Sequence, residues 1–422
     1  MRSRRCASAS IRGTEVADAA SERLLSGRAW SDFCDVLKVA GEIVDRFEDI
    51  DDLDRTEWYR CLSRYTRGML ERYVEAGDPG RLELVEMAWR HSINCTSPMQ
   101  DQLFAEFDPS HEYRLFGNRH DCPYIVFMSW THRQPADLGA RDWAPAGIEG
   151  LKEFDPAWLP AVGTLLSDDV PFDAAGNFEV IVSQNRPADG TSWLPITPDC
   201  VGLLIRTHYH SWDGVQRAQI GIERIGGEPP RPIRPDDLSR MLAKSAQAVL
   251  GYAELLRGWW QDNLSRRPNA ITYSQATYLS NGGVPDRRHH GFGSWRKGPD
   301  EALVVRFTPP PCRFWTFQVC NIWQENLDNY ADGQGYLSDG STLLEPDGSV
   351  LFVLADRDPR VGARWVDSYG HQHGVWSSRL IHVDGDPPAI SVHRIPFSDL
   401  CASGIAGLAP ETAIVSGGPA PD

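Results

Sequence analysis

The sequence predicts a mainly β protein with added helices, built as two antiparallel β-sandwich or jelly-roll-like units that an internal repeat relates. Three observations support this fold class. Gly, Pro and Trp residues recur at a fixed spacing, short β-prone runs alternate with turn residues in two parts of the chain, and two other parts show helical periodicity. N-terminal helices and a long helix between the units complete the expected architecture.

The internal repeat depends on Gly, Pro and Trp, which makes a chance match improbable. Five residues have a counterpart 172 positions later: Gly176, Pro187, Gly190, Trp193 and Gly202 recur as Gly348, Pro359, Gly362, Trp365 and Gly374. Both copies carry an apolar, β-prone run after the first Gly, at 178–182 and 350–354. Upstream, 122–127 matches 312–317 at an offset of 190, so the first copy holds 18 more residues between its matched blocks.

Length, composition and charge narrow the class of protein. A chain of 422 residues exceeds the ~250–300 at which one hydrophobic core stops growing, so we expect more than one domain. Hydrophobic residues at 41% and charged residues at 24% are typical of a globular protein. The net charge of −16 would repel phosphate backbones, which argues against nucleic acid as a partner.

The sequence shows no signal for export or membrane insertion. The basic residues at 2–5 are not followed by an apolar segment, and no stretch approaches the ~20 apolar residues that span a bilayer. We therefore expect a cytoplasmic protein without a membrane partner. Phosphate-binding loops, dinucleotide fingerprints and nucleophile elbows are also missing, so we expect no cofactor.

Helical periodicity characterises the N-terminal part of the chain. After a loose tail at 1–15, a helical region is expected at 16–110, with one helix from Ser31 to Phe47. A second helix is predicted from Asp54, which would cap it with Glu57 three residues later. Gly77 would end this helix, and its apolar face would contain Trp58, Leu62, Tyr65, Met69 and Tyr73. Both helices are expected to pack on the first β unit, since a single apolar face needs a partner.

The two predicted β units follow, separated by a helix. In the first unit, 111–228, strands are expected at 113–117, 123–130, 178–183 and 201–209. In the second, 266–400, they are expected at 302–308, 313–320, 349–355 and 375–383. The region 229–265 between them holds a Pro-rich connector and a helix from Asp236 to Asn263. The Pro- and Gly-rich end, 401–422, is expected to be a loose tail.

Several of these residues resemble a bacterial family. The resemblance is carried by Ser192-Trp193-Leu194-Pro195, by Arg206 followed by Tyr209 and Trp212, and above all by Trp365-Val366-Asp367-Ser368-Tyr369-Gly370-His371 with Gly374 and Arg379. They are similar to proteins that carry domain of unknown function 1214 (DUF1214), often beside the related domain 1254 (DUF1254). The resemblance spans roughly 55–385 and implies sandwich or jelly-roll domains, but the family brings no agreed activity.

The chain also departs from the pattern of this family. Where relatives usually show Asn-Pro-Asp followed by Tyr, it has Ser97-Pro98-Met99 and then Gln102. Ser192 and Arg364 stand where Asn commonly precedes the Trp. If the carboxylate, amide and phenol of the family served a common site, this member has lost several of them.

The strongest catalytic candidates are Asp367, His371 and Arg379. A carboxylate that fixes the tautomer of an imidazole, beside a guanidinium that can hold a developing anion, forms a workable acid-base group. The alternative is structural: Asp367 would cap backbone amides and His371 would bond to a carbonyl. The first copy has Pro195 and Asp199 at the matching positions, so the Asp and His are special to the second unit.

The remaining candidates would bind a substrate or a metal ion. Substrate-binding side chains are expected at Trp365, Trp193, Tyr369, Tyr209 and Arg206, although large aromatic residues are usually part of a core. Two His-x-His pairs, His208/His210 and His371/His373, could each offer two imidazoles to a metal, since residues two apart in a strand share a face. A third ligand is not evident, so no metal is the preferred expectation. The run Arg287-Arg288-His289-His290 is interpreted as a solvated loop, with an anion clamp as the alternative.

Three hypotheses for function follow. In the first, an enzyme acts by acid-base chemistry on a largely apolar small molecule held between the β units. In the second, a non-catalytic protein presents aromatic rings to carbohydrates or lipids. In the third, the His-x-His pairs belong to a metal-dependent enzyme. A small-molecule ligand is thus the expected partner, and assembly into a homo-oligomer is left open.

Overall fold

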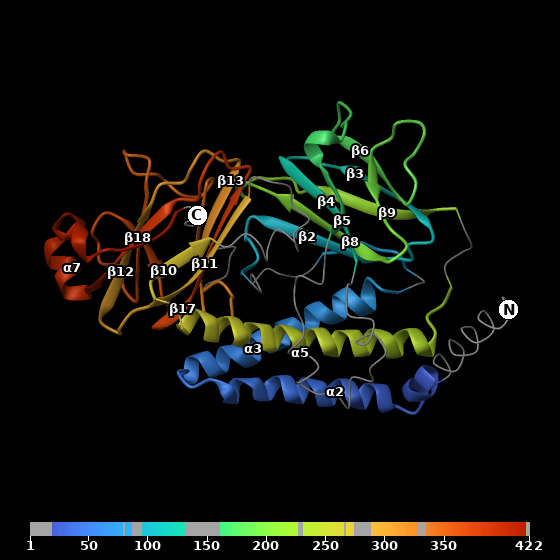
Figure 1. Ribbon diagram of the computed structural model, residues 1–422, viewed down its shortest axis with the longest axis horizontal. Coiled ribbons are helices and arrows are strands. Elements are labelled where there is room, and N and C mark those ends of the chain that lie inside the picture. The colour runs from blue at the N-terminus through green and yellow to red at the C-terminus, as the bar shows by residue number, and fades with distance from the viewer. Residues whose placement is uncertain are drawn as a thin grey trace, which may run out of the picture.

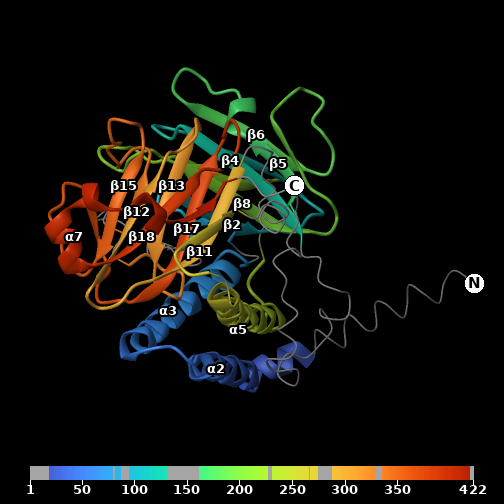
Figure 2. The same ribbon diagram turned by 60° about the vertical axis from the view of Figure 1, so that its left-hand side comes forward.

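The computed structural model consists of two β units that lie side by side on a layer of helices (Figures 1 and 2). It describes residues 19–78, 81–86, 95–131, 161–226, 231–265, 267–273, 288–327 and 335–418. The tail predicted at 1–15 lies outside the described residues. No helix in these ranges has the length and apolar composition needed to cross a membrane.

In its described residues, the first β unit contains nine strands in two sheets, ordered β1-β2-β8-β4-β5 and β7-β6-β3-β9. Their bounds are β1 Val85–Glu86, β2 Gln100–Glu106, β3 Glu112–Asn118, β4 Tyr124–Thr131, β5 Ala161–Leu166, β6 Asn177–Ser183, β7 Trp193–Pro195, β8 Cys200–His208 and β9 Gln219–Ile225. Apolar side chains from both sheets, such as Ile125, Val180 and Ile205, pack together between them. The four strands predicted for this unit correspond to β3, β4, β6 and β8.

The second β unit contains sheets ordered β10-β11-β17-β13-β14 and β16-β15-β12-β18-β19. Their bounds are β10 Ala270–Tyr273, β11 Arg288–Arg296, β12 Glu301–Phe307, β13 Phe314–Cys320, β14 Tyr336–Ser338, β15 Val350–Ala355, β16 Arg364–Asp367, β17 His373–Ile381, β18 Ala389–Pro396 and β19 Ile414–Gly417. Phe317, Phe352 and Trp376 belong to the apolar cluster between these sheets. Strand for strand, β1 to β9 and β10 to β18 occupy the same places in their sheets.

The repeated Gly and Trp residues have the same local role in both units. Gly176 and Gly348 adopt φ angles of 87° and 80°, in the region that favours glycine, at the turns before β6 and β15. Trp193 Nε1 donates to the Ser183 carbonyl at 3.1 Å, and Trp365 Nε1 donates to the Ala355 carbonyl at 2.9 Å. Each Trp thus ties a short edge strand to the strand beside it, β7 to β6 and β16 to β15.

The prediction of antiparallel sheets is wrong for one pair of strands in each unit. β6 pairs with β7 in parallel, and β15 pairs with β16 in parallel, so one sheet of each unit is mixed. In each unit, the chain leaves the longer strand, β6 or β15, and turns through a second glycine at positive φ, Gly190 or Gly362. It then enters the short strand, β7 or β16, which runs parallel to the longer one. Because β7 and β16 are only three and four residues long, alternation along them cannot reveal their direction.

The described helices are α2 Arg28–Gly41, α3 Asp52–Leu70, α5 Pro235–Ser265 and α7 Phe397–Ser403, with short helical turns at η1 Glu42–Arg46, η2 Glu71–Glu75, η6 Ser167–Asp169, η8 Ile405–Gly407 and η9 Pro410–Thr412. The N-cap of α3 is Asp51, not Asp54 as predicted. Asp51 accepts from the backbone N–H of Asp54 at 2.9 Å, and the Asp54 carboxylate accepts from Asp51 N–H at 3.2 Å. Asp54 is thus the third residue of a reciprocal capping box. Glu57 takes no part in this cap and contacts His371 instead.

The helices contact both β units, which corrects the prediction that they pack on the first. One apolar cluster, the central cluster, joins Trp58 and Tyr65 of α3 and Leu256 of α5 to Val126 of the first unit and Val375 of the second. Polar contacts attach the N-terminal half of α3 to the second unit: Trp323 Nε1 donates to the Asp54 carbonyl at 2.8 Å.

Two predicted boundaries divide elements of the structure. The region 16–110, predicted to be helical, contains β1 and β2. β2 belongs to the first β unit, because it is hydrogen-bonded to β8. Its sequence, Gln-Asp-Gln-Leu-Phe-Ala-Glu, has few β-prone residues, so pairing with neighbours decides its conformation. The predicted tail at 401–422 includes the end of α7 and β19, which pairs with β18.

Candidate functional site

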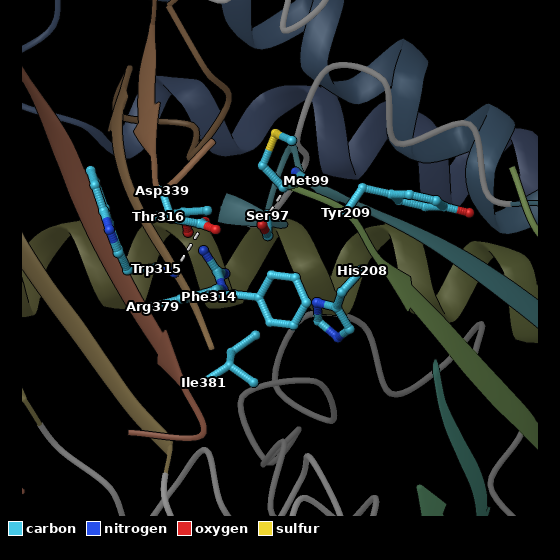
Figure 3. A pocket seen from close by; sticks show the side chains of 10 residues that line it. All are labelled: Ser97, Met99, His208, Tyr209, Phe314, Trp315, Thr316, Asp339, Arg379 and Ile381. Atoms are coloured by element: carbon cyan, nitrogen blue, oxygen red, sulfur yellow. Dashed lines mark hydrogen bonds between the residues drawn. The ribbon is translucent and has the colours of Figure 1, made fainter. Parts of the chain in front are cut away.

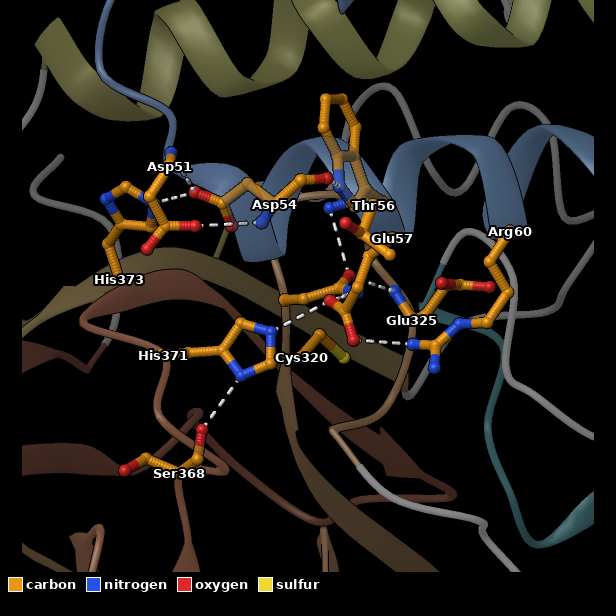
Figure 4. A network of polar contacts seen from close by, with 12 residues as sticks. Asp51, Asp54, Thr56, Glu57, Arg60, Cys320, Glu325, Ser368, His371 and His373 are labelled. Atoms are coloured by element: carbon orange, nitrogen blue, oxygen red, sulfur yellow. Dashed lines mark hydrogen bonds and ion pairs between the residues drawn. The ribbon is translucent and has the colours of Figure 1, made fainter.

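His371 lies buried where the second β unit meets α3, at the turn between β16 and β17 (Figure 4). The residue is 3% exposed. Its Nδ1 lies 2.8 Å from the Ser368 carbonyl oxygen, and its Nε2 lies 2.8 Å from Glu57 Oε2. Because both partners accept hydrogen bonds, both ring nitrogens must donate, which requires a protonated imidazolium.

Glu57 completes this buried ion pair from the opposite side (Figure 4). Its carboxylate also accepts from Asn321 Nδ2 at 2.7 Å and from Arg60 Nη2 at 2.5 Å. Burial alone would lower the pKa of His371, but the hydrogen bond and charge of Glu57 raise it. Burial likewise opposes ionisation of Glu57, yet His371 and then Asn321 hold its pKa below the ordinary value.

His373 makes a second contact of the same kind. Its Nε2 lies 2.7 Å from Asp54 Oδ2, in the first turn of α3. Glu57, Asn321, His371, Asp54 and His373, which we call the α3 network, therefore attach the helix to the second β unit. The pair His371/His373 does not share one face of a strand, because His371 precedes β17.

The predicted group of Asp367, His371 and Arg379 is not assembled. Asp367 Oδ1 accepts from the backbone N–H of Tyr369 at 2.7 Å, so the carboxylate caps a turn while Glu57 binds the imidazole. Arg379 lies six residues beyond His373 in β17, about 20 Å further along an extended strand. Tyr369, predicted to bind substrate, is 45% exposed on that turn.

The aromatic residues predicted to bind a substrate lie in different parts of the structure. Trp193 and Trp365 are held by their bonds to backbone carbonyls in the edge-strand motif. Tyr209 is buried, and its hydroxyl accepts from the Ala218 backbone N–H at 3.0 Å. It lies beside a pocket between the two β units, as does Arg379. With His208, a candidate of the metal alternative, these are the predicted site residues that the structure brings to the pocket.

This pocket, the interunit pocket, is small and lies between the end of β8 and the strands β13 and β17 (Figure 3). Its lining consists of Ser97, Met99, His208, Tyr209, Phe314, Trp315, Thr316, Asp339, Arg379 and Ile381. The closed part of its cavity measures about 10 Å³, room for about one water molecule, and its mouth is partly open to solvent. Cavities that bury a drug-sized ligand measure about 300–1,000 Å³, so an organic ligand would have to extend through the open mouth or displace side chains of the wall.

A histidine and a carboxylate meet beside the interunit pocket. His210 Nδ1 makes a short contact with Asp339 Oδ2, joining the first unit to the second. The imidazole stacks on Phe314, with ring centroids 4.4 Å apart and an interplanar angle of 19°. Asp339 is held in turn, because its Oδ1 accepts from the Trp315 backbone N–H at 3.4 Å. Burial raises the pKa of Asp339, against the hydrogen bond from His210.

The close approach of the two units depends on a glycine next to Asp339. A Cβ atom added at Gly340 would lie 1.7 Å from the carbonyl oxygen of His210. No side chain fits at that distance, so only glycine lets His210 reach Asp339. Sequence reasoning missed Asp339, Gly340 and Phe314, because nothing local distinguishes them from other turn and strand residues.

His208 and Arg206 are the polar side chains that β8 places at the interface between the two units. His208 is 2% exposed, and its ring centroid lies 5.4 Å from that of Tyr124. Burial, followed by the charges of Arg288 and Arg206, lowers the pKa of His208 well below its usual value, so the ring is neutral. Burial, with Arg288 and Arg379, also lowers the pKa of Arg206 to about 9.

The histidine pairs do not form a metal site in the described part of the chain, where no cluster of three or more His, Cys, Asp and Glu side chains could hold an ion. His210 is bound to Asp339, and His371 and His373 are bound to Glu57 and Asp54. Each of these three imidazoles therefore has a carboxylate partner of its own.

Comparison with known proteins reveals a shared fold and no activity. No protein-family model matches the chain, and no curated protein matches it. It is similar to the crystal structure of an uncharacterized protein from Burkholderia cenocepacia, at 28% identity and a TM-score of 0.78 over 90% of this chain and 100% of the other. A Vibrio parahaemolyticus protein aligns at 11% identity and a TM-score of 0.42 over 77% of this chain and 94% of the other.

Proposed function

We propose that this protein is an enzyme that binds a small molecule in the interunit pocket and acts on it by acid-base chemistry, with His210 as the acid or base. The observation that carries the proposal is the contact between His210 and Asp339 across the boundary of the two units. Asp339 would fix the tautomer and orientation of the imidazole, and Phe314 would hold its plane. The proposal keeps acid-base chemistry and moves it from His371 to His210.

Access and hydrogen bonding favour His210 over His371. The His210 side chain is 45% exposed, and among the described residues only its Nδ1 takes part in a hydrogen bond. His210 lies outside the lining of the pocket and contacts the lining residue Asp339, so Nε2 is the nitrogen that the proposal assigns to a ligand. Both nitrogens of His371 are occupied in a sealed interface, so that imidazole can exchange a proton only if α3 separates from the second unit.

The pocket wall indicates the kind of molecule that would bind. Met99, Phe314 and Ile381 supply apolar contacts, while Arg379 and His208 supply donors. Pockets of this composition orient a ligand through a few polar groups and hold the rest by burial. A compact molecule with an apolar body and a polar end matches the chemistry of this lining.

A non-catalytic binding function is the second candidate, in the form of the same pocket without turnover. A platform for sugars is less well supported. The exposed large aromatic residues in the described ranges, Trp30, Tyr59, Phe116 and Tyr369, lie on α2, α3, β3 and the turn after β16. Rings on four separate elements do not form the single flat surface on which a sugar would stack.

A proton-exchange assay tests the enzymatic proposal. A panel of small carboxylic acids, amides and alcohols would first be screened for thermal stabilisation of the protein. Each hit would then be incubated with protein in deuterated water and followed by proton NMR for loss of C–H signals or for new products. We expect turnover of at least one hit, and its loss in His210→Gln.

The control for this assay is His393→Gln, which alters a histidine on β18 of the second unit that is hydrogen-bonded to Thr412. Its turnover should equal that of the natural chain. Turnover that persists in His210→Gln would contradict the assignment of the acid-base group. Binding without turnover of any hit would favour the non-catalytic alternative.

Two further proposals concern the ancestry of the chain. We propose that the β units are jelly-roll-like copies of one module, which the matching strand orders and the paired Trp contacts support. We also propose a relationship to the family with domain of unknown function 1214, supported by the stretch from Trp365 to His371. A solved structure of a member of that family would test both, since its strand order should match.

A further inference from the structure

Three arginines gather where the outer faces of two sheets meet, next to the interunit pocket. Arg206 lies on β8 of the first unit, and Arg288 and Arg379 lie on the neighbouring strands β11 and β17 of the second. The charges of Arg288 and Arg379 act on Arg206, and that of Arg379 acts on Arg288. We call these three side chains the guanidinium cluster.

Strand register places Arg288 next to the pocket wall, and of the three arginines Arg379 alone lines the pocket itself. Arg288 is directly opposite Ile381, and His290 is directly opposite Arg379. Ile381 and Arg379 both line the pocket. Residues two apart in a strand share a face, so Arg288 and His290 lie on the same side of the sheet as these wall residues. His208 faces them from the first unit and also lines the pocket.

Arg288 is fixed in place but has donors to spare. The residue is 6% exposed, and its side chain is hydrogen-bonded to the hydroxyl of Tyr124. Tyr124 is held in turn by His382, whose Nε2 lies 2.8 Å from the same hydroxyl. In the described residues, Nε and Nη2 of Arg288 have no hydrogen-bond partner. Buried donors without partners are rare in folded proteins and are unfavourable.

The two unpartnered nitrogens of Arg288 lie on one edge of the guanidinium. Nε–H and one N–H of Nη2 point in parallel, and this fork matches the two oxygens of a carboxylate. His208 Nε2 also has no partner among the described residues, although His208 is 2% exposed. A planar oxyanion could accept from all three nitrogens at once if the neutral His208 carries its proton on Nε2.

We propose that Arg288 and His208, with Arg206 and Arg379 nearby, form a binding site for the carboxylate of a small organic acid. The inference rests on the proposed function, because it names the substrate class of the same pocket: the apolar body would lie against Phe314 and Met99, and the carboxylate would reach Arg288. A free inorganic oxyanion such as phosphate shares part of this chemistry, so the test separates the two.

Ligand-observed NMR with three probes tests the site at constant ionic strength. The probes are benzoate, the neutral isostere benzamide, and inorganic phosphate. For the natural chain we expect benzoate to bind at least ten times more tightly than benzamide and more tightly than phosphate. Arg288→Met should weaken benzoate at least tenfold and leave benzamide unchanged.

The matched control is Arg306→Met, which removes an arginine that pairs with Asp347 on the exposed side of β12. Benzoate affinity should be the same as in the natural chain. If Arg288→Met does not fold, His208→Gln provides the second variant and should weaken benzoate by at least fivefold.

The other outcomes distinguish failure of the carboxylate site from failure of the proposed function. Equal binding of benzoate and benzamide, unaffected by Arg288→Met, would remove the carboxylate site and leave the proposed enzyme intact. Arg288-dependent binding of phosphate without benzoate would show an inorganic anion site instead. Benzoate binding that depends on Arg288 in a protein whose turnover ignores His210→Gln would keep the site and reject the acid-base role.

Discussion

The α3 network and the interunit pocket both pair histidines with carboxylates. They differ in whether the imidazole has a ring nitrogen without a hydrogen-bond partner and in how exposed it is. In the α3 network, every nitrogen of His371 has an acceptor and the residue is 3% exposed. At the pocket, His210 is 45% exposed in its side chain and is bonded through Nδ1 alone among the described residues. The same residue types therefore make a structural ion pair at one place and a candidate acid-base group at the other.

Hydrogen-bond satisfaction and exposure, not residue type, therefore distinguish His371 from the acid-base group that we propose at His210. A fully bonded imidazolium has no proton to exchange without breaking the fold. Unpartnered buried donors, such as those of Arg288 and His208, mark a place where the fold leaves its polar groups open to a ligand. Four substitutions or conditions can break this contrast.

The largest effect is expected for Glu57→Gln, which removes the charge opposite His371. Breaking a buried ion pair on one side costs about 3–5 kcal/mol, because the other charge stays buried without a partner. We expect the free energy of unfolding in urea to fall by that amount. The control Glu179→Gln alters a half-exposed pair with Arg114 and should cost less than about 1 kcal/mol. Equal losses in both variants would show that Glu57 is not part of a sealed network.

Gly340→Ala should act next most strongly. The added Cβ would meet the His210 carbonyl, so the turn must move away from the first unit. Overpacking of this kind costs about 1–3 kcal/mol, and we expect the His210–Asp339 contact to be lost with it. Gly258→Ala is the control, because Gly258 is exposed on α5 with open space around it. Alanine there should stabilise the helix by about 0.5–1 kcal/mol; a neutral result at Gly340 would contradict the close approach.

The stability of the protein should depend on pH through the α3 network. The folded pKa of His371 is raised, so its contribution is fully present below the ordinary value of about 6.5 and is lost as pH rises through the folded value. The folded pKa of Glu57 is lowered, so its contribution is present above about 4.3 and is lost as pH falls through the folded value. The network stabilises most between these two ordinary values.

Urea unfolding of the natural chain and of His371→Gln at several pH values checks this dependence. The natural chain should lose stability above about pH 6.5, by about 1.4 kcal/mol for each unit by which the pKa is raised. His371→Gln should lack that loss, and His393→Gln should retain it. A natural chain that grows more stable over this range would reverse the sign and reject the ion pair.

The smallest effect on stability is expected for Asp339→Asn. Since the His210 side chain is half exposed, its contact with Asp339 should contribute less than about 1 kcal/mol. Turnover, in contrast, should fall by about 100-fold or more, because the imidazole loses the group that orients it. The assay is proton NMR of the hits from the ligand screen. A variant that loses stability but keeps its turnover would place Asp339 with the structural carboxylates.

The sequence predicts local structure well where one residue type has one physical reason. Gly176 and Gly348 are glycines because their φ angles are positive, and Trp193 and Trp365 recur because each indole closes the same edge-strand motif. The long helix predicted from Asp236 corresponds to α5, which begins at Pro235, because its periodicity extends over many turns.

The candidate site could not be predicted, because its contacts join residues that are far apart in the chain. Glu57 and His371 are separated by 314 positions, and His210 and Asp339 by 129. The sequence predicts a solvated loop at Arg288, since Gly and His surround it, yet Arg288 begins β11, which pairs with β17 in the middle of its sheet. Strand pairing, not local composition, places these side chains together.

The most direct test of the account is the rate at which diethyl pyrocarbonate modifies each histidine of the intact protein at about pH 7, where an exposed neutral imidazole reacts. Peptide mass spectrometry would give the rate for every histidine. The account predicts rapid modification of His210, faster still in Asp339→Asn, and protection of His371 until the protein unfolds. Rapid modification of His371 in the folded protein, with His210 protected, would contradict it.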